Sequence, residues 1–354
     1  MTKGIWYTMK PSKINRSVIQ VIVKRAIHQL QDNPEREIRN LVDLGGMFAK
    51  GEFQRTFFDT AGKELEKENS AYYEVVKRLV CQTDYDALFT FGMNFGYNSL
   101  THGAYKIREF ENDMDFNVPW TIFIRIKEEG LLDAENLTGI IEQGKAMGIF
   151  NYTLLIERNY SKMAEIANMM AVHNDCAFIL PVAPEEILYE SNIASILALK
   201  NIFIGLNIRD AEDGQLAAAI KLLREKKILC AAFYPMKSDE QIAIDEPLKQ
   251  ASASGFELLF ILQDGSFYLK NPEIIQELVY AYRKDPSMPV IPFDLLSDVL
   301  SVDRSISTEG CLAFISEEGV LSIVNMETGE KKTGYNIIDT SLSAVFGDAL
   351  SKSH

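Results

Sequence analysis

Cysteine and histidine are the first side chains to consider, because thiolates and imidazoles carry most metal, redox and nucleophilic chemistry. Neither type is clustered in this sequence: there is no CxxC pair, and histidines are scarce. The complete set is Cys81, Cys176, Cys230, Cys311, His28, His102, His173 and His354. This spacing does not support a zinc or iron–sulfur site built from one local loop. We expect four reduced and mostly buried thiols.

The familiar nucleotide, metal and hydrolase motifs are also absent from the sequence. It contains no Walker A, GxGxxG, HExxH or GxSxG pattern. Gly92, Gly96 and Gly103 lie close together but lack the phosphate-loop spacing, so they predict turns. The acidic residues of 133–135 and 185–186 precede helix-like segments, where they favour the positive end of the helix dipole.

Charged and polar residues do recur where predicted strands end. They are Arg125, Lys127, Glu128, Glu157, Arg158, Asn207, Arg209, Asp210, Tyr234, Lys237, Gln263 and Asp264. In β/α barrels, chemistry gathers at the carboxyl ends of the strands. An anionic small molecule held by arginine forks is one interpretation, and salt bridges that fill the cavity are the other. The candidate ligand-binding residues are Arg125, Glu157, Arg158, Asn207, Arg209 and Tyr234.

The overall composition limits the classes of partner that this protein is expected to bind. The chain has 354 residues, a net charge of −14 and 47% hydrophobic residues, which are values of a globular protein with an acidic surface. Such a surface repels nucleic-acid phosphates, so we expect no nucleic-acid partner. No apolar run reaches the length of a membrane span, and residues 1–7 contain no signal core. We therefore expect a cytoplasmic protein without a membrane partner.

The elements that position these residues fall into three predicted regions. Residues 1–118 show helical periodicity over 17–30, 35–49 and 72–79, with an irregular segment at 89–100. In residues 119–295, short apolar runs alternate with helix-like segments. The runs are 121–126, 152–156, 176–180, 202–206, 228–233, 256–262 and 290–293. The helices are 135–147, 162–173, 184–200, 213–226, 238–252 and 272–283.

This alternation predicts an α/β fold, namely a partial (β/α)6 TIM-like barrel with parallel strands; a doubly wound open sheet is the alternative. After about residue 296 the alternation lapses. Residues 296–354 then predict a small extension, with a hairpin of strands 311–314 and 320–324 and a helix at 342–350.

Several stretches, in order, resemble one branch of the radical SAM superfamily. That branch has a helical N-terminal region and a SPASM- or twitch-like C-terminal extension. The segment N-V-P-W-T-I-F-I at 117–124 is similar to its first barrel strand, N-I-P-W-x-I-L-I. Further similar segments are 94–98, 136–148, 173–178, 310–313, 334–338 and 341–342.

Departures from the family pattern remove its cofactor ligands. The loop within 125–135 has no cysteine where the family places three, and Leu155-Ile156-Glu157-Arg158 stands for the family's G-G-E-P. Val182-Ala183-Pro184 replaces T-N-G, and Asn207 and Arg209 replace a serine and a glutamate. Carboxylates are poor substitutes for cluster thiolates, and branched side chains block close backbone approach.

The resemblance therefore implies a degenerate family member. We expect no iron–sulfur cluster and no metal, and we expect Cys311 to be a buried thiol. The sequence leaves open whether S-adenosylmethionine still binds weakly without iron. The predicted function is a non-catalytic peptide- or partner-binding or regulatory protein, whose partner is a peptide or an intact radical SAM relative. The alternative is an enzyme of another class that binds an anionic small molecule at the barrel mouth. If the resemblance is superficial, only an acidic α/β protein is predicted.

Overall fold

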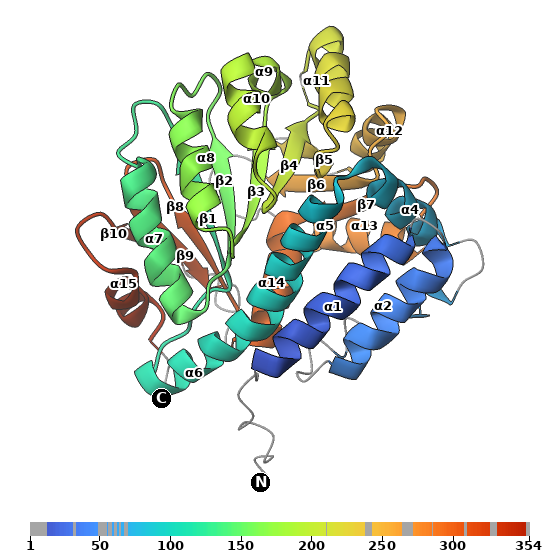
Figure 1. The fold of residues 1–354 in the computed structure, drawn as a ribbon. Coiled ribbons are helices and arrows are strands. Elements are labelled where there is room, and N and C mark those ends of the chain that lie inside the picture. Colours follow the sequence, from blue (N-terminus) through green and yellow to red (C-terminus); the bar gives the residue numbers. More distant parts are fainter. Residues whose placement is uncertain are drawn as a thin grey trace.

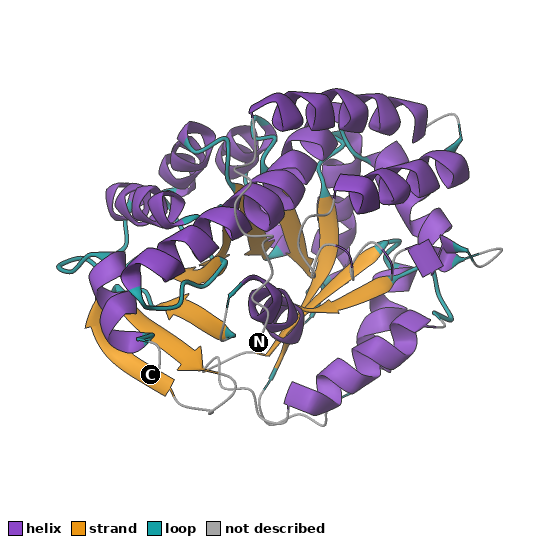
Figure 2. Ribbon diagram, turned by 90° about the horizontal axis from the view of Figure 1, so that it is seen from below, coloured by secondary structure: helices purple, strands orange, loops and turns teal. Residues whose placement is uncertain are grey.

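A computed structural model gives the architecture of the chain. It describes residues 13–30, 33–48, 70–209, 211–237, 243–263, 272–284, 286–307, 310–325 and 331–351, with six further positions between 55 and 66. A curved sheet forms its centre, and helices surround the sheet (Figures 1 and 2). The predicted partial TIM-like barrel is confirmed.

The sheet has ten strands in the order β10-β9-β8-β1-β2-β3-β4-β5-β6-β7. Strands β1 to β7 run parallel in chain order, β8 pairs in parallel with the other edge of β1, and β9 and β10 add antiparallel. Helices cover the parallel strands, which are apolar for this reason. The strands are β1 (Thr121–Ile126), β2 (Asn151–Ile156), β3 (Ala177–Val182), β4 (Ile202–Asn207), β5 (Cys230–Met236), β6 (Leu258–Gln263), β7 (Ile291–Asp294), β8 (Cys311–Ile315), β9 (Val320–Asn325) and β10 (Lys331–Asn336).

The described helices belong to the N-terminal region or follow individual strands. Those of the N-terminal region are α1 (Lys13–Leu30), α2 (Pro34–Phe48), α4 (Ala71–Gln82), α5 (Tyr85–Gly92), the π-helix η1 (Met93–Gly103) and α6 (Ala104–Met114). Those of the barrel and the C-terminal end are α7 (Ala134–Met147), α8 (Met163–Val172), α9 (Pro184–Leu188), α10 (Glu190–Leu197), α11 (Asp213–Glu225), α12 (Asp245–Ala253), α13 (Pro272–Lys284), α14 (Leu295–Ile306) and α15 (Leu342–Ala349).

The segment predicted to be irregular, residues 89–100, is instead helical and spans the end of α5 and most of η1. Its asparagines serve packing rather than turns. The Asn94 side-chain amide donates to the carbonyl oxygens of Asn174 and Cys176 at 2.8 and 2.9 Å, and the Asn98 amide donates to Asp175 at 2.8 Å. These bonds attach the N-terminal region to the turn before β3.

The C-terminal region joins the barrel more closely than its sequence predicted. The β8–β9 hairpin is confirmed, but β8 also extends the barrel sheet through its register with β1, for example Ile122 with Ala313. Sequence patterning missed α14 and β10. Helix α14 begins at Leu295, directly after the last residue of β7, Asp294, whose side chain accepts from the Leu296 N–H. No loop therefore separates the strand from the helix in the sequence.

Buried carboxylates connect α6, α14, β1 and β8. Asp303 is fully buried and accepts from the Trp120 N–H at 3.0 Å and from the Cys311 N–H at 2.6 Å. Glu111 accepts from the Val118 N–H at 2.9 Å and from the Ser307 hydroxyl at 2.5 Å. Burial raises the pKa of Asp303 to about 7, with a further contribution from the charge of Glu111, although the two backbone donors oppose the shift.

This shift predicts that the free energy of unfolding depends on pH, and that Asp303→Asn makes this dependence weaker. Between the ordinary pKa of 3.8 and about 7, the folded state holds a proton that the unfolded state has released. The free energy of unfolding therefore falls as pH rises through this interval, by a few kcal/mol at about 1.4 kcal/mol per pKa unit. Asp303→Asn is expected to be less stable at pH 4.5 and to show a flatter pH profile. Urea unfolding at several pH values measures both effects, and parallel profiles would contradict the assignment.

Candidate functional site

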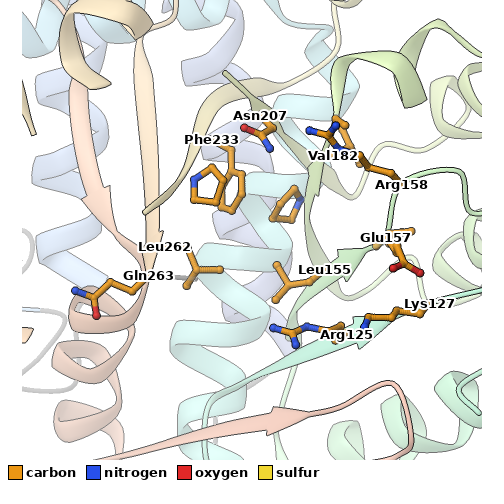
Figure 3. A pocket seen from close by; sticks show the side chains of 14 residues that line it. Arg125, Lys127, Leu155, Glu157, Arg158, Val182, Asn207, Phe233, Leu262 and Gln263 are labelled. Carbon is orange, nitrogen blue, oxygen red and sulfur yellow. The ribbon is translucent and has the colours of Figure 1, made fainter. Parts of the chain in front are cut away.

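A pocket of about 430 Å³ opens at the carboxyl ends of β1 to β6 (Figure 3). Side-chain alternation on the strands explains its lining: on β1, Ile124 and Ile126 are fully buried, while Arg125 between them reaches the pocket. The complete lining is Arg125, Lys127, Leu155, Ile156, Glu157, Arg158, Pro181, Val182, Ala183, Asn207, Phe233, Pro235, Leu262 and Gln263.

The lining carries more positive than negative charge. Arg125, Lys127 and Arg158 face the same space as one carboxylate, Glu157, although the whole chain has a net charge of −14. Figure 3 shows Arg125 reaching from β1 toward the pocket beside Leu155, its register partner on β2. The pocket therefore combines a locally cationic side with an apolar wall.

The loop between β1 and α7, residues 127–133, is held to two neighbouring loops. The Glu128 carboxylate accepts from the Ser161 N–H at 2.8 Å and from its hydroxyl at 2.6 Å, and these bonds lower the pKa of Glu128. Lys127 forms an ion pair with Glu317 of the β8–β9 turn at 2.5 Å. Burial works against ionisation of Glu317, but the Lys127 bond outweighs it and lowers the pKa of Glu317.

The same β8–β9 turn touches the β1–α7 loop through the backbone. The Leu131 N–H donates to the Glu317 carbonyl at 2.8 Å, and a Cβ on Gly130 would lie 2.8 Å from that carbonyl oxygen. Gly130 is needed for this close approach. The C-terminal hairpin thereby contributes directly to the rim of the pocket.

The loop after β2 is attached to α9. The Asn159 backbone is left-handed, with φ of 62°, and its N–H donates to Glu186 at 2.5 Å. Glu186 is buried, and the neighbouring Glu185 forms an ion pair with Arg158 at 3.2 Å. Glu185 and Glu186 begin α9 as expected, and they also fix the loop that carries Glu157 and Arg158.

Four of the six predicted ligand-binding residues lie at one pocket, namely Arg125, Glu157, Arg158 and Asn207. Arg209 and Tyr234 are not part of its described lining. The Arg209 N–H donates to the Asn207 side chain at 2.9 Å, its guanidinium donates to the Pro235 carbonyl at 2.8 Å, and it lies 5.2 Å from the Tyr234 ring centroid. Arg209 is thereby bonded to two residues of the pocket lining, Asn207 and Pro235.

The other polar candidates divide between the lining, the rim and the surface. Gln263 and Lys127 line the pocket, Glu128 belongs to the rim, and Lys237 is exposed. Asp210 and Asp264 lie outside the described residues. The salt-bridge interpretation holds for Lys127 and Arg158, whose partners come from the β8–β9 turn and α9, while the cavity stays open.

Sequence analysis missed the apolar half of the site. Leu155, Phe233 and Leu262 were assigned to strands but not to a pocket. Val182 was considered only as part of the segment that replaces T-N-G, beyond the predicted strand 176–180. Strand alternation from Arg125 was the available signal, because residues at the same level of neighbouring parallel strands face the same interior. Gly205 also contributes: a Cβ there would lie 3.2 Å from Cβ of Phe233, so glycine permits this side chain to lie against β4.

The thiols lie away from the pocket. Cys230 and Cys311 begin β5 and β8, and Cys176 directly precedes β3, so all three lie at the amino ends of strands, whereas the pocket opens at the carboxyl ends of β1 to β6. Within the described ranges, no three cysteine, histidine or acidic side chains gather as a metal site. Burial raises the pKa of Cys230 to about 12 and that of Cys176 further.

Thiol labelling should distinguish these positions. Cys81 is exposed, whereas Cys176 and Cys311 are buried and Cys230 is half-buried with a raised pKa. We expect iodoacetamide at pH 8 to modify Cys81 first in the native protein, because the thiolate is the reactive form and must be accessible. Peptide mass spectrometry gives the rate at each site. Cys81→Ser should remove the fast phase, and rapid modification of Cys176 or Cys311 would contradict the structure.

None of the helices in the described part of the chain is both long and apolar enough to span a bilayer. No family model matches the sequence. No curated protein matches it either.

Solved structures of SuiB from Streptococcus suis are similar in fold. The structure of SuiB bound to S-adenosylmethionine has 12% identity and a TM-score of 0.48, and the match covers 69% of this chain and 67% of SuiB. The structure bound to precursor peptide SuiA has 12% identity and a TM-score of 0.47 over 69% and 68%. A third SuiB structure has 10% identity and a TM-score of 0.49 over 95% and 82%. At these values neither activity nor ligand transfers to this chain.

Proposed function

We propose that this protein is a cluster-free relative of radical SAM proteins that binds a peptide or a protein partner at the barrel mouth. The loop between β1 and α7 is the main support. Its residues, 127–133, contain no cysteine at the place where the resembled family holds its cluster. The loop is instead tied into the rim by Glu128 and Lys127.

The positions of the described thiols also support the proposal. A radical SAM cluster needs three thiolates at the carboxyl end of the barrel, whereas Cys176, Cys230 and Cys311 lie at the amino ends of strands. The donors described here therefore do not fit such a cluster. Leu155 and Ile156 add to this, because their side chains line the pocket at the positions of two family glycines.

The preformed rim of the pocket is consistent with a protein that binds a ligand without redox chemistry. Its rim loops are connected by side-chain bonds from Glu128, Glu186 and Arg158, which hold a defined shape before a ligand arrives. Preorganised sites bind more tightly because less conformational entropy is lost. Peptide-modifying members of the resembled superfamily bind peptides or protein partners, so a peptide or an intact relative is the first class of partner to test.

A second candidate is an enzyme of another class that acts on an anionic small molecule. The observation in its favour is that Arg125, Lys127, Arg158 and Glu157 line the same pocket. Cations can anchor such a substrate, and a carboxylate can accept a proton. Turnover of a bound ligand, followed by mass spectrometry with wild type and Glu157→Gln, separates this candidate from a binding protein.

Anaerobic reconstitution with iron and sulfide tests the cluster-free assignment. We expect far less than one cluster per chain and no dithionite-sensitive absorbance, since no cysteine stands in loop 127–133. An intact radical SAM protein treated in parallel is the positive control. Calorimetry of the iron-free protein with S-adenosylmethionine is expected to show no binding. Stoichiometric iron and sulfide would refute the proposal.

A further inference from the structure

The pocket separates charge from apolar surface. Arg125 and Lys127 come from β1 and the residues after it, whereas Leu155, Phe233 and Leu262 come from β2, β5 and β6. In Figure 3 the two cations lie on one side of the pocket and these apolar side chains around its middle. A ligand that fits this distribution has one charged end and an apolar body.

Arg125 is the deepest of the three lining cations. It lies within β1, in register with Leu155, while Lys127 follows the strand end. Each strand residue advances about 3.3 Å, so Lys127 begins roughly 7 Å closer to the mouth. Lys127 and Arg158 are engaged by rim carboxylates, Lys127 by Glu317 at 2.5 Å and Arg158 by Glu185 at 3.2 Å. Arg125 also has an interaction partner within the fold, so only its depth distinguishes it from the other two cations. A ligand that enters the pocket reaches Arg125 after it has passed these rim residues.

The surrounding charges favour a singly charged anion. Glu157 lines the same space, and Glu317 and Glu185 stand at its rim. A phosphate dianion would be repelled by these carboxylates, whereas one carboxylate matches the planar fork of one guanidinium. Phe233, Leu262 and their neighbours form an apolar wall. Covering this wall favours binding only if the ligand surface that covers it is also apolar, because apolar surface is then removed from water.

We infer that the pocket binds an amphipathic monocarboxylate, with its carboxylate on Arg125 and its apolar body against Leu155, Phe233 and Leu262. The cavity of about 430 Å³ lies in the range of sites for small ligands. The same chemistry is offered by a free aryl- or alkyl-carboxylate and by the C-terminal residue of a peptide that ends in an apolar side chain. This inference rests on the barrel mouth being the binding site of the proposed function.

Calorimetry with matched probes tests the inference on the full chain. The free probe is 4-phenylbutyrate, with 4-phenylbutyramide and phenyl phosphate as comparisons. The peptide probe ends in leucine, and its amidated form is the control. We expect each carboxylate to bind at least tenfold more tightly than its amide, and 4-phenylbutyrate more tightly than phenyl phosphate. The better of the two carboxylate probes identifies the source of the ligand.

Substitutions at Arg125 test whether this residue holds the carboxylate of the ligand. Arg125→Met is expected to weaken carboxylate binding about 10- to 100-fold, the range for a hydrogen bond to a charged group. Arg125→Lys, which retains the charge without the fork, should show a smaller loss. Lys221→Met removes one charge from an exposed position on α11 and should leave affinity unchanged. Urea unfolding confirms that each variant is folded.

Several results would overturn the inference. They are equal binding of carboxylate and amide, tighter binding of phenyl phosphate, unchanged affinity in both Arg125 variants, or no binding of either carboxylate at millimolar concentration. The amide comparison uses wild-type protein, so it remains decisive even if Arg125→Met does not fold. Cluster assembly would refute the proposed function by a separate measurement, and loss of carboxylate selectivity without a cluster would refute only the ligand class.

Discussion

The starting points of β1 and β8 are held together by one buried carboxylate, Asp303, which accepts from the backbone N–H groups of Trp120 and Cys311. β1 then pairs in parallel with β2 on one side and β8 on the other. The place of Arg125 relative to Leu155 follows from this register. The turn after β8 is likewise brought beside the loop after β1, where Glu317 meets Lys127.

The two ends of the barrel have different physical roles. At the amino ends, the side chains of Asn94 and Asn98 bond to backbone carbonyls before β3 and join the N-terminal region to the barrel. Asp303 joins α14 to the starts of β1 and β8. At the carboxyl ends, side-chain pairs join one loop to the next and leave a cavity between them. The side-chain bonds to the backbone and the open cavity therefore lie at opposite ends of the barrel, and in barrels of parallel strands the carboxyl end is the one where active sites form.

Strand positions were the most predictable feature of this protein. Residues 121–126 were predicted as a strand and form β1, because a short apolar run covered by helices has few other stable arrangements. The grouping of Arg125, Glu157, Arg158 and Asn207 was also predictable, since parallel strands end at one edge. Arg209 was predicted with them, but its guanidinium bonds to the Pro235 carbonyl instead. The spacing of the strands does not predict which nearby group a long side chain will bond.

Other features depend on contacts between distant segments. Helix η1 was predicted to be irregular because glycine and asparagine usually mark turns, but its asparagines bond to residues 174–176. Helix α14 was missed because it begins directly after the last residue of β7, without a loop between them. The apolar pocket wall escaped notice because Phe233 and Leu262 are equally typical of a filled core.

By itself, the sequence determined the alternation of strands and helices, the scattered thiols and the cysteine-free loop after β1, since these depend on residue type and local spacing. Tertiary structure decided that β8 pairs with β1, that Lys127 and Arg158 meet Glu317 and Glu185, and that Arg125 lines the same pocket as Leu155, Phe233 and Leu262. Those outcomes depend on which remote backbone and side-chain groups become neighbours, and local periodicity contains no information about such pairings.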